Sequence, residues 1–200
     1  MRVTPKTDPV TVDFGDRAGA DLRYIRDAME RAGSFTAVPG WGMVAMGMTA
    51  LAASALAAAQ PTFEGWLAVW LAEGALAVAV GGAAMALKAR RLGTSLVAPP
   101  ARKFAMGFAP AIAVGALSTV ALLRAGAHDP IPGTWLSLYG CAVVAGGAFS
   151  VPAVPLAGAG FLALGAAALV APEAGDLLLA LGFGGVNLGF GAWVARRHGG

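Results

Sequence analysis

The chain has 200 residues, of which 58% are hydrophobic and only 12% are charged. Because a soluble domain carries about 25% charged residues, this composition does not cover a water-facing surface of ordinary size, and it excludes a typical soluble globular domain. The net charge is +3, with no dense basic patch interleaved with aromatic residues, so nucleic acid is not an expected partner. The single cysteine, Cys141, cannot form a disulfide within the chain.

The first 35 residues are polar, and residues 16–33 predict an amphipathic helix. Asp16 is suited to cap it, and apolar side chains follow at helical spacing. The segment holds four acidic and four basic residues, several of them paired four positions apart. A helix that adheres to anionic lipid is usually basic, so balanced charge favours contact with a protein, with a plain interfacial helix as the alternative. The candidate docking residues are Leu22, Ile25, Met29, Arg23 and Arg26.

Six continuously apolar stretches fill the rest of the chain. They predict membrane spans at residues 36–59, 65–87, 104–123, 134–150, 153–171 and 177–195. A helix needs about 17–25 apolar residues to cross the hydrocarbon core, and the absence of alternation favours helices over a barrel. The predicted fold class is therefore an all-α membrane protein, in which a six-helix transmembrane bundle (residues 36–200) follows a cytoplasmic tail (residues 1–35).

The basic residues are distributed asymmetrically between the two sides of this predicted bundle. With six spans, thirteen of the fourteen Lys and Arg residues fall on one side, and only Arg124 falls on the other. The positive-inside rule then places both termini in the cytoplasm. Residues 57–59 resemble a signal-peptide cleavage site, but the preceding polar segment is too long for a signal peptide, so the first span is expected to remain.

Glu73 is the main candidate for chemistry, because it lies near the middle of the second span. A carboxyl group there is costly and almost always faces protein or a water-filled cavity. Asn187 lies at a comparable depth in the sixth span, within a Gly-x-x-x-Gly pattern. We expect a polar cluster in the outer half of the bundle, with separate interhelical hydrogen bonds as the alternative. The candidate members are Glu73, Asn187, Tyr139, Ser118 and Thr119.

No metal site or cofactor is predicted. Met43, Met46 and Met48 offer soft thioether ligands, but they do not share one helix face and have no supporting Cys or His. His128 and Asp129 lie together in a loop, and two such residues do not make a metal site.

The sequence from Asp21 to Gly42, which includes Arg23-Tyr24-Ile25-Arg26 and Ser34-Phe35-Thr36-Ala37-Val38-Pro39-Gly40-Trp41, resembles the start of a group of bacterial membrane proteins with no assigned activity. This resemblance implies a six-helix protein of the bacterial inner membrane. It implies no residue roles.

Two functions from different classes remain. One is a non-catalytic accessory or sensory subunit that docks a partner, and the other is a small transporter or channel that uses Glu73. Pro39-Gly40-Trp41 and Pro132-Gly133-Thr134-Trp135 open the first and fourth predicted spans. Because three spans separate them, halves related in this way would have opposite topology, as in many transporters. An enzyme is not expected, because the sequence holds no nucleophile–base pair and no phosphate-binding glycine loop. The expected partners are membrane lipids and either further copies of the chain or a larger membrane complex.

Overall fold

The computed structural model describes residues 38–93, 99–150 and 153–198, together with a few isolated positions. These positions are Gly19, Asp21, Leu22, Tyr24, Ile25, Met29, Ser95 and Val97. The chain divides into an N-terminal unit, Met1–Ser34, and a second unit, Phe35–Gly200, which holds the bundle. In the N-terminal unit each described residue is helical, and the rest of the predicted helix at 16–33 lies outside the described residues.

The described part of the chain is all-α, with 88% helix and no strand. In chain order the elements are α2 (Gly40–Ala58), α3 (Phe63–Arg91), α4 (Pro99–Arg124), α5 (Ile131–Gly147), α6 (Ala153–Val170), η1 (Pro172–Ala174), α7 (Gly175–Leu179), η2 (Ala180–Val186) and α8 (Asn187–His198). α7, η2 and α8 follow one another without a break, and η2 is a π-helical segment within this rod.

Five helical runs among the described residues are long and apolar enough to cross a membrane. They are α2, α3, α4, α6 and the run Pro172–Arg197. α5 has 17 residues, which is the lower end of the length that a spanning helix needs.

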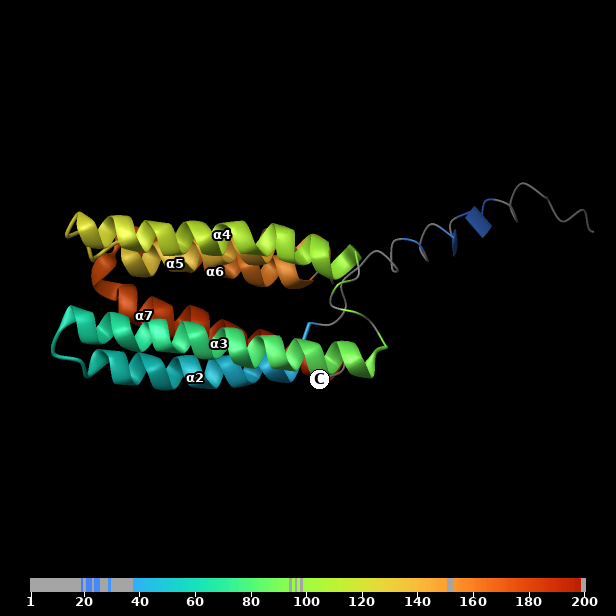
Figure 1. The fold of residues 1–200 in the computed structure, drawn as a ribbon, viewed down its shortest axis with the longest axis horizontal. Coiled ribbons are helices and arrows are strands. Elements are labelled where there is room, and N and C mark those ends of the chain that lie inside the picture. The colour runs from blue at the N-terminus through green and yellow to red at the C-terminus, as the bar shows by residue number, and fades with distance from the viewer. Residues whose placement is uncertain are drawn as a thin grey trace, which may run out of the picture. The chain divides into compact units, whose positions relative to one another are not determined.

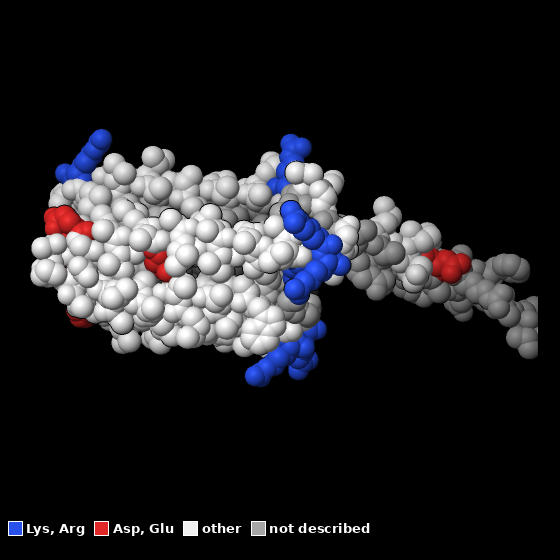
Figure 2. All heavy atoms as spheres, turned by 60° about the horizontal axis from the view of Figure 1, so that its bottom comes forward, with Lys and Arg blue, Asp and Glu red and all other residues white. Residues whose placement is uncertain are grey.

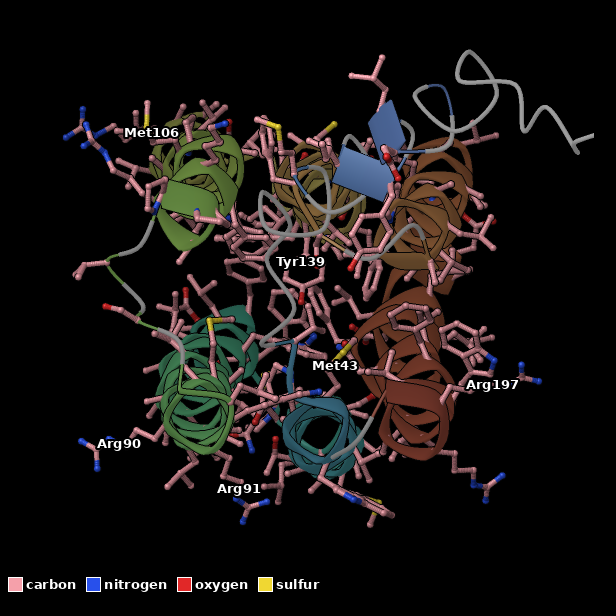
Figure 3. All side chains as sticks on the ribbon, turned by 90° about the vertical axis from the view of Figure 1, so that its right-hand side faces the viewer. Met43, Arg90, Arg91, Met106, Tyr139 and Arg197 are labelled. Carbon is pink, nitrogen blue, oxygen red and sulfur yellow. The ribbon has the colours of Figure 1, made fainter. Side chains whose placement is uncertain are left out.

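The helices of the bundle form two layers of three (Figures 1 and 3). One layer contains α3, α2 and α8, with α2 in the middle, and the other contains α4, α5 and α6, with α5 in the middle. The rod of α7 and η2 joins the layers along one edge, where it contacts α5 and α6. At the opposite edge the backbone of α3 lies close to that of α2, and the backbone of α4 lies close to that of α5, whereas α3 reaches the rod through the side chains of Trp66 and Trp70. Each layer is therefore more tightly built than the contact between the layers at this edge.

The termini of α3 show why the helix extends beyond the predicted span at both ends. The Thr62 hydroxyl accepts a hydrogen bond from the Gly65 backbone N–H at 3.1 Å, which caps the N-terminus. Basic side chains in the last turn suit the negative end of the helix dipole. Gly93, at φ 64°, then turns the chain in a conformation that glycine adopts without strain. The charged residues assigned to the loop by hydropathy are thus part of the helix.

Charge separates along the bundle (Figure 2). Blue Lys and Arg atoms gather at one end of the bundle, which we call the basic end. At the other end, the acidic end, red Asp and Glu atoms lie with one blue side chain, and a further red group is visible part-way along the side of the bundle. The basic end carries Lys88, Arg90, Arg91, Arg102, Lys103, Arg196 and Arg197. The acidic end carries Glu64, Asp129, Glu173, Asp176 and Arg124.

Candidate functional site

Glu73 lies in the contact between α3 and α2, with only 8% of its surface exposed. Its Oε1 lies 2.9 Å from the Thr49 hydroxyl oxygen of α2. The same hydroxyl lies 3.0 Å from the backbone carbonyl oxygen of Met46, one turn earlier in α2. The carboxyl group is therefore held between two helices by a hydroxyl that also reaches its own helix backbone.

Small residues bring α2 and α3 together on the basic side of Glu73. A Cβ at Gly81 would lie 2.9 Å from the sulfur of Met46, and a Cβ at Gly42 would overlap Ala84. Thr49 continues the stripe of Gly42 and Met46 at helical spacing, so it faces α3 as they do. Sequence reasoning missed Thr49, although its place on this stripe was the available signal.

Asn187 is 4% exposed and bonds to its own helix. Its Nδ2 donates to the Phe183 carbonyl oxygen at 2.9 Å, while its backbone N–H donates to Gly184 instead. In a regular α-helix the carbonyl of Phe183 would accept a hydrogen bond from the backbone N–H of Asn187. The π segment directs that N–H elsewhere, and the side-chain amide of Asn187 donates to the Phe183 carbonyl in its place. Asn187 Oδ1 is buried without a hydrogen-bond partner among the described residues, as is Trp70 Nε1.

Thr119 belongs to a separate contact between α4 and α5. The Thr119 hydroxyl accepts a hydrogen bond from Trp135 Nε1 at 2.9 Å and donates to the Gly115 carbonyl oxygen at 2.9 Å. Ser118 is partly exposed, and its hydroxyl forms no hydrogen bond with the described residues. Thr119 is thus a tie between two neighbouring helices of one layer.

Tyr139 lies between the two layers, where Figure 3 shows it with Met43 in the interior of the bundle. Its ring is 5.8 Å from Phe108, 4.7 Å from Phe161 and 5.0 Å from Phe183, all edge-on. Phe183 also lies 6.2 Å from Trp70, which extends the aromatic cluster to α3. Edge-to-face and tilted rings at these distances attract one another, so the cluster joins α3, α4, α5, α6 and the rod that contains η2.

The five residues predicted to form one polar cluster are thus distributed over several places. No hydrogen bond joins any two of Glu73, Asn187, Tyr139, Ser118 and Thr119. Glu73 links α3 to α2, and Thr119 links α4 to α5. Asn187 donates a hydrogen bond to a backbone carbonyl of its own rod. Tyr139 contributes its ring to the layer contact.

Lys88 is a buried cation that sequence reasoning assigned to a loop. It is 7% exposed, and its Nζ donates to the Val38 carbonyl oxygen at 2.8 Å. Val38 belongs to an apolar cluster at the basic end, which also includes Ala89 and Val194. The long lysine side chain therefore crosses from the last turn of α3 to the residues just before α2.

A shallow hollow of about 330 Å³ lies at the acidic end. His128 stacks flat on Phe63, with ring centroids 3.8 Å apart, and Trp66 Nε1 donates to Asp176 Oδ1 at 2.7 Å. Asp129 and Glu173 also line the hollow, and Glu73 does not. The described residues contain no group of three or more His, Cys, Asp or Glu side chains suited to hold a metal ion.

The docking candidates of the N-terminal unit are exposed where they are described. Leu22 is 67% exposed, Ile25 is 52% and Met29 is 71%. Tyr24, on another side of the same helical segment, is 70% exposed. Arg23 and Arg26 lie outside the described residues.

No family model, curated protein or solved structure matches this chain.

Proposed function

We propose that this protein is a non-catalytic subunit of a membrane complex, in an accessory or sensory role, and that it docks a protein partner through Leu22, Ile25 and Met29. The exposure of these three side chains carries the proposal. If the helix predicted at residues 16–33 is continuous, their spacings of three and four place them on one apolar face. Large apolar side chains on one helix face are commonly covered by another protein or by lipid.

The transmembrane part of the proposal is a bundle of six spans. α5 is the shortest of them, and its place in the middle of a layer supports a full crossing. The basic end would face the cytoplasm, because cytoplasmic loops carry the excess of Lys and Arg. Both termini are then cytoplasmic. The resemblance of residues 21–42 to bacterial membrane proteins supports the inner membrane of a bacterium as the location.

The buried polar groups support a structural role for the bundle. Thr49 and Thr119 each connect two helices through a hydrogen bond, and Lys88 connects α3 to Val38, which precedes α2. In lipid such bonds replace contacts with water that the side chains have lost. A bundle tied in this way would serve as an anchor that presents its N-terminal segment to a partner.

Site-specific photo-crosslinking in the native membrane tests the docking proposal. A photoreactive amino acid at Met29 is expected to give a protein adduct of discrete mass, because the apolar stripe contacts the partner. The matched control is the same amino acid at Tyr24, which is also exposed but lies about 140° away around the helix by the 3.6-residue period. Adducts with phospholipid alone at Met29 would contradict docking and indicate an interfacial helix.

Transport through the bundle is a second candidate, and Glu73 is the observation in its favour. Intramembrane carboxyl groups often mark ion or proton pathways. The position of Glu73 gives this candidate less support than docking, because its carboxyl group is buried in the contact between α2 and α3, and the hollow at the acidic end is not lined by it.

A further inference from the structure

We propose that Glu73 and Thr49 form a proton-binding site within the α2–α3 contact. In this site the Glu73 carboxyl group is protonated. It donates a hydrogen bond to the Thr49 hydroxyl oxygen, and the Thr49 hydroxyl donates a hydrogen bond to the Met46 carbonyl. The ligand is a single proton. The inference does not depend on the docking function proposed above.

The number of hydrogens available to Thr49 is the first argument. Its oxygen is within hydrogen-bond distance of two oxygens, at 2.9 Å from Glu73 and 3.0 Å from the Met46 carbonyl. A hydroxyl group donates one hydrogen and accepts others, whereas a backbone carbonyl only accepts. Thr49 therefore satisfies both contacts fully when Glu73 provides the second hydrogen, and a carboxyl group has one only when it is protonated.

The surroundings of Glu73 are the second argument. α2, the helix packed against it, contains no ionisable side chain from Gly40 to Ala58. On α3 the nearest charged residues are Glu64 and Lys88, about 13 Å and 22 Å away along the helix at 1.5 Å per residue. No opposite charge on α2 or α3 is thus close enough to pair with a Glu73 carboxylate, and an unpaired charge in such a place is costly.

The small number of oxygen ligands favours a proton over a metal cation. Ca²⁺ takes six to eight oxygen ligands and Mg²⁺ takes six. The contact brings together one carboxyl group and one hydroxyl group, and the described residues contain no group of three or more His, Cys, Asp or Glu side chains that could hold a metal ion. The observed 2.9 Å is an ordinary O–H···O separation.

Infrared spectroscopy of the full-length protein in lipid nanodiscs tests the proposal directly. At pH 7 water-exposed carboxyl groups are ionised, so a protonated-carboxyl band at that pH identifies a buried acid. We expect such a band in the wild-type protein and its complete loss in Glu73→Gln. Thr49→Val is expected to shift the band to higher frequency, because the acceptor is removed, whereas Thr49→Ser leaves it unchanged. Glu64→Gln, at the end of the same helix, is the control and should keep the band.

Two results would overturn the proposal. The first is a folded wild-type protein with no protonated-carboxyl band at pH 7, which would mean that Thr49 donates to an ionised Glu73. The second is loss of the band when sodium replaces choline at constant pH, which would assign the site to a metal cation. If Glu73→Gln does not fold, ¹³C labelling of glutamate carboxyl groups in the wild-type protein assigns the band, because only a glutamate band then shifts.

Discussion

Individual buried polar residues of this protein mostly find partners on a neighbouring segment rather than in a shared site. Thr49 reaches Glu73, Trp135 reaches Thr119, and Lys88 reaches Val38. Interhelical hydrogen bonds of this kind contribute about 0.6 kcal/mol on average in membrane proteins, and up to about 1.7 kcal/mol. Each tie is modest, and their effect is to fix which helix faces which.

Thr119→Val is expected to reduce the free energy of unfolding by about 1–2 kcal/mol, since it leaves the Trp135 indole N–H without its acceptor at nearly unchanged side-chain volume. Denaturation in detergent micelles, followed by circular dichroism, measures this loss. Ser118→Ala is the matched control, because the neighbouring hydroxyl forms no hydrogen bond with the described residues. Equal effects of the two substitutions would show that the Trp135 bond contributes nothing.

The sequence was sufficient to single out Glu73 and Asn187 as polar groups inside the bundle, because hydropathy locates a charged or amide side chain within an apolar run. It did not provide their partners. Thr49 is 24 residues from Glu73, and which turn of α2 meets which turn of α3 depends on the packing of the two helices. The Asn187 bond depends on a π segment, which carries no hydropathy signal.

At the scale of whole helices, apolar run length predicted the elements well. The described helices lie within a few residues of the predicted spans. Charged and capping residues extend α3 at both ends, and α5 begins and ends three residues earlier than its predicted span. The π segment was not foreseen. It places Phe183 among the rings of Trp70, Tyr139 and Phe161, where one residue of the rod contacts three other helices.

Glycine sets the distance between α5 and α6, the pair of helices with the most extensive contact. A Cβ at Gly158 would lie 2.8 Å from the Val144 backbone nitrogen and 2.9 Å from the Gly140 carbonyl oxygen, and a Cβ at Gly140 would meet the α6 backbone similarly. Because these contacts are with backbone atoms, no side-chain rotation relieves them. The two helices would have to separate.

Gly158→Ala is therefore expected to destabilise the bundle by up to about 2 kcal/mol, because overpacking costs about 1–3 kcal/mol and alanine gains roughly 1 kcal/mol over glycine within a helix. Gly160→Ala is the control on the same helix, since a Cβ there meets nothing within 4 Å, and it should be neutral or slightly stabilising. Thermal unfolding in detergent compares the two. A fall in stability for Gly160→Ala as large as that for Gly158→Ala would contradict the close contact of α5 and α6.

At the scale of the whole molecule, the two halves of the chain are not related as inverted repeats. Such a repeat would match α2 with α5, α3 with α6 and α4 with the rod that ends in α8. In the two-layer arrangement every match exchanges the layer and reverses the helix direction. The matches of α3 with α6 and of α4 with the rod also exchange the edge, while α2 and α5 both stay in the middle (Figure 3). Changing all three at once is an inversion through a point, which no rotation produces. The shared Pro-Gly-Trp pattern is thus explained by helix-start chemistry, and the transport candidate has no internal symmetry behind it.

The number of spans decides on which sides of the membrane the termini lie, and α5 is the helix on which that number depends. If α5 crosses, a cysteine at Tyr24 and one at Arg197 lie on the same side and a cysteine at Asp129 lies on the other. The test uses a Cys141→Ser background, which removes the only native thiol. In intact cells an impermeant maleimide should label position 129 alone, and in permeabilised cells it should label all three positions.

Labelling of position 24 or 197, but not both, in intact cells would mean an odd number of crossings and would remove α5 from the spanning set. Labelling of both, with 129 protected, would keep six spans and reverse the orientation that the basic end predicts.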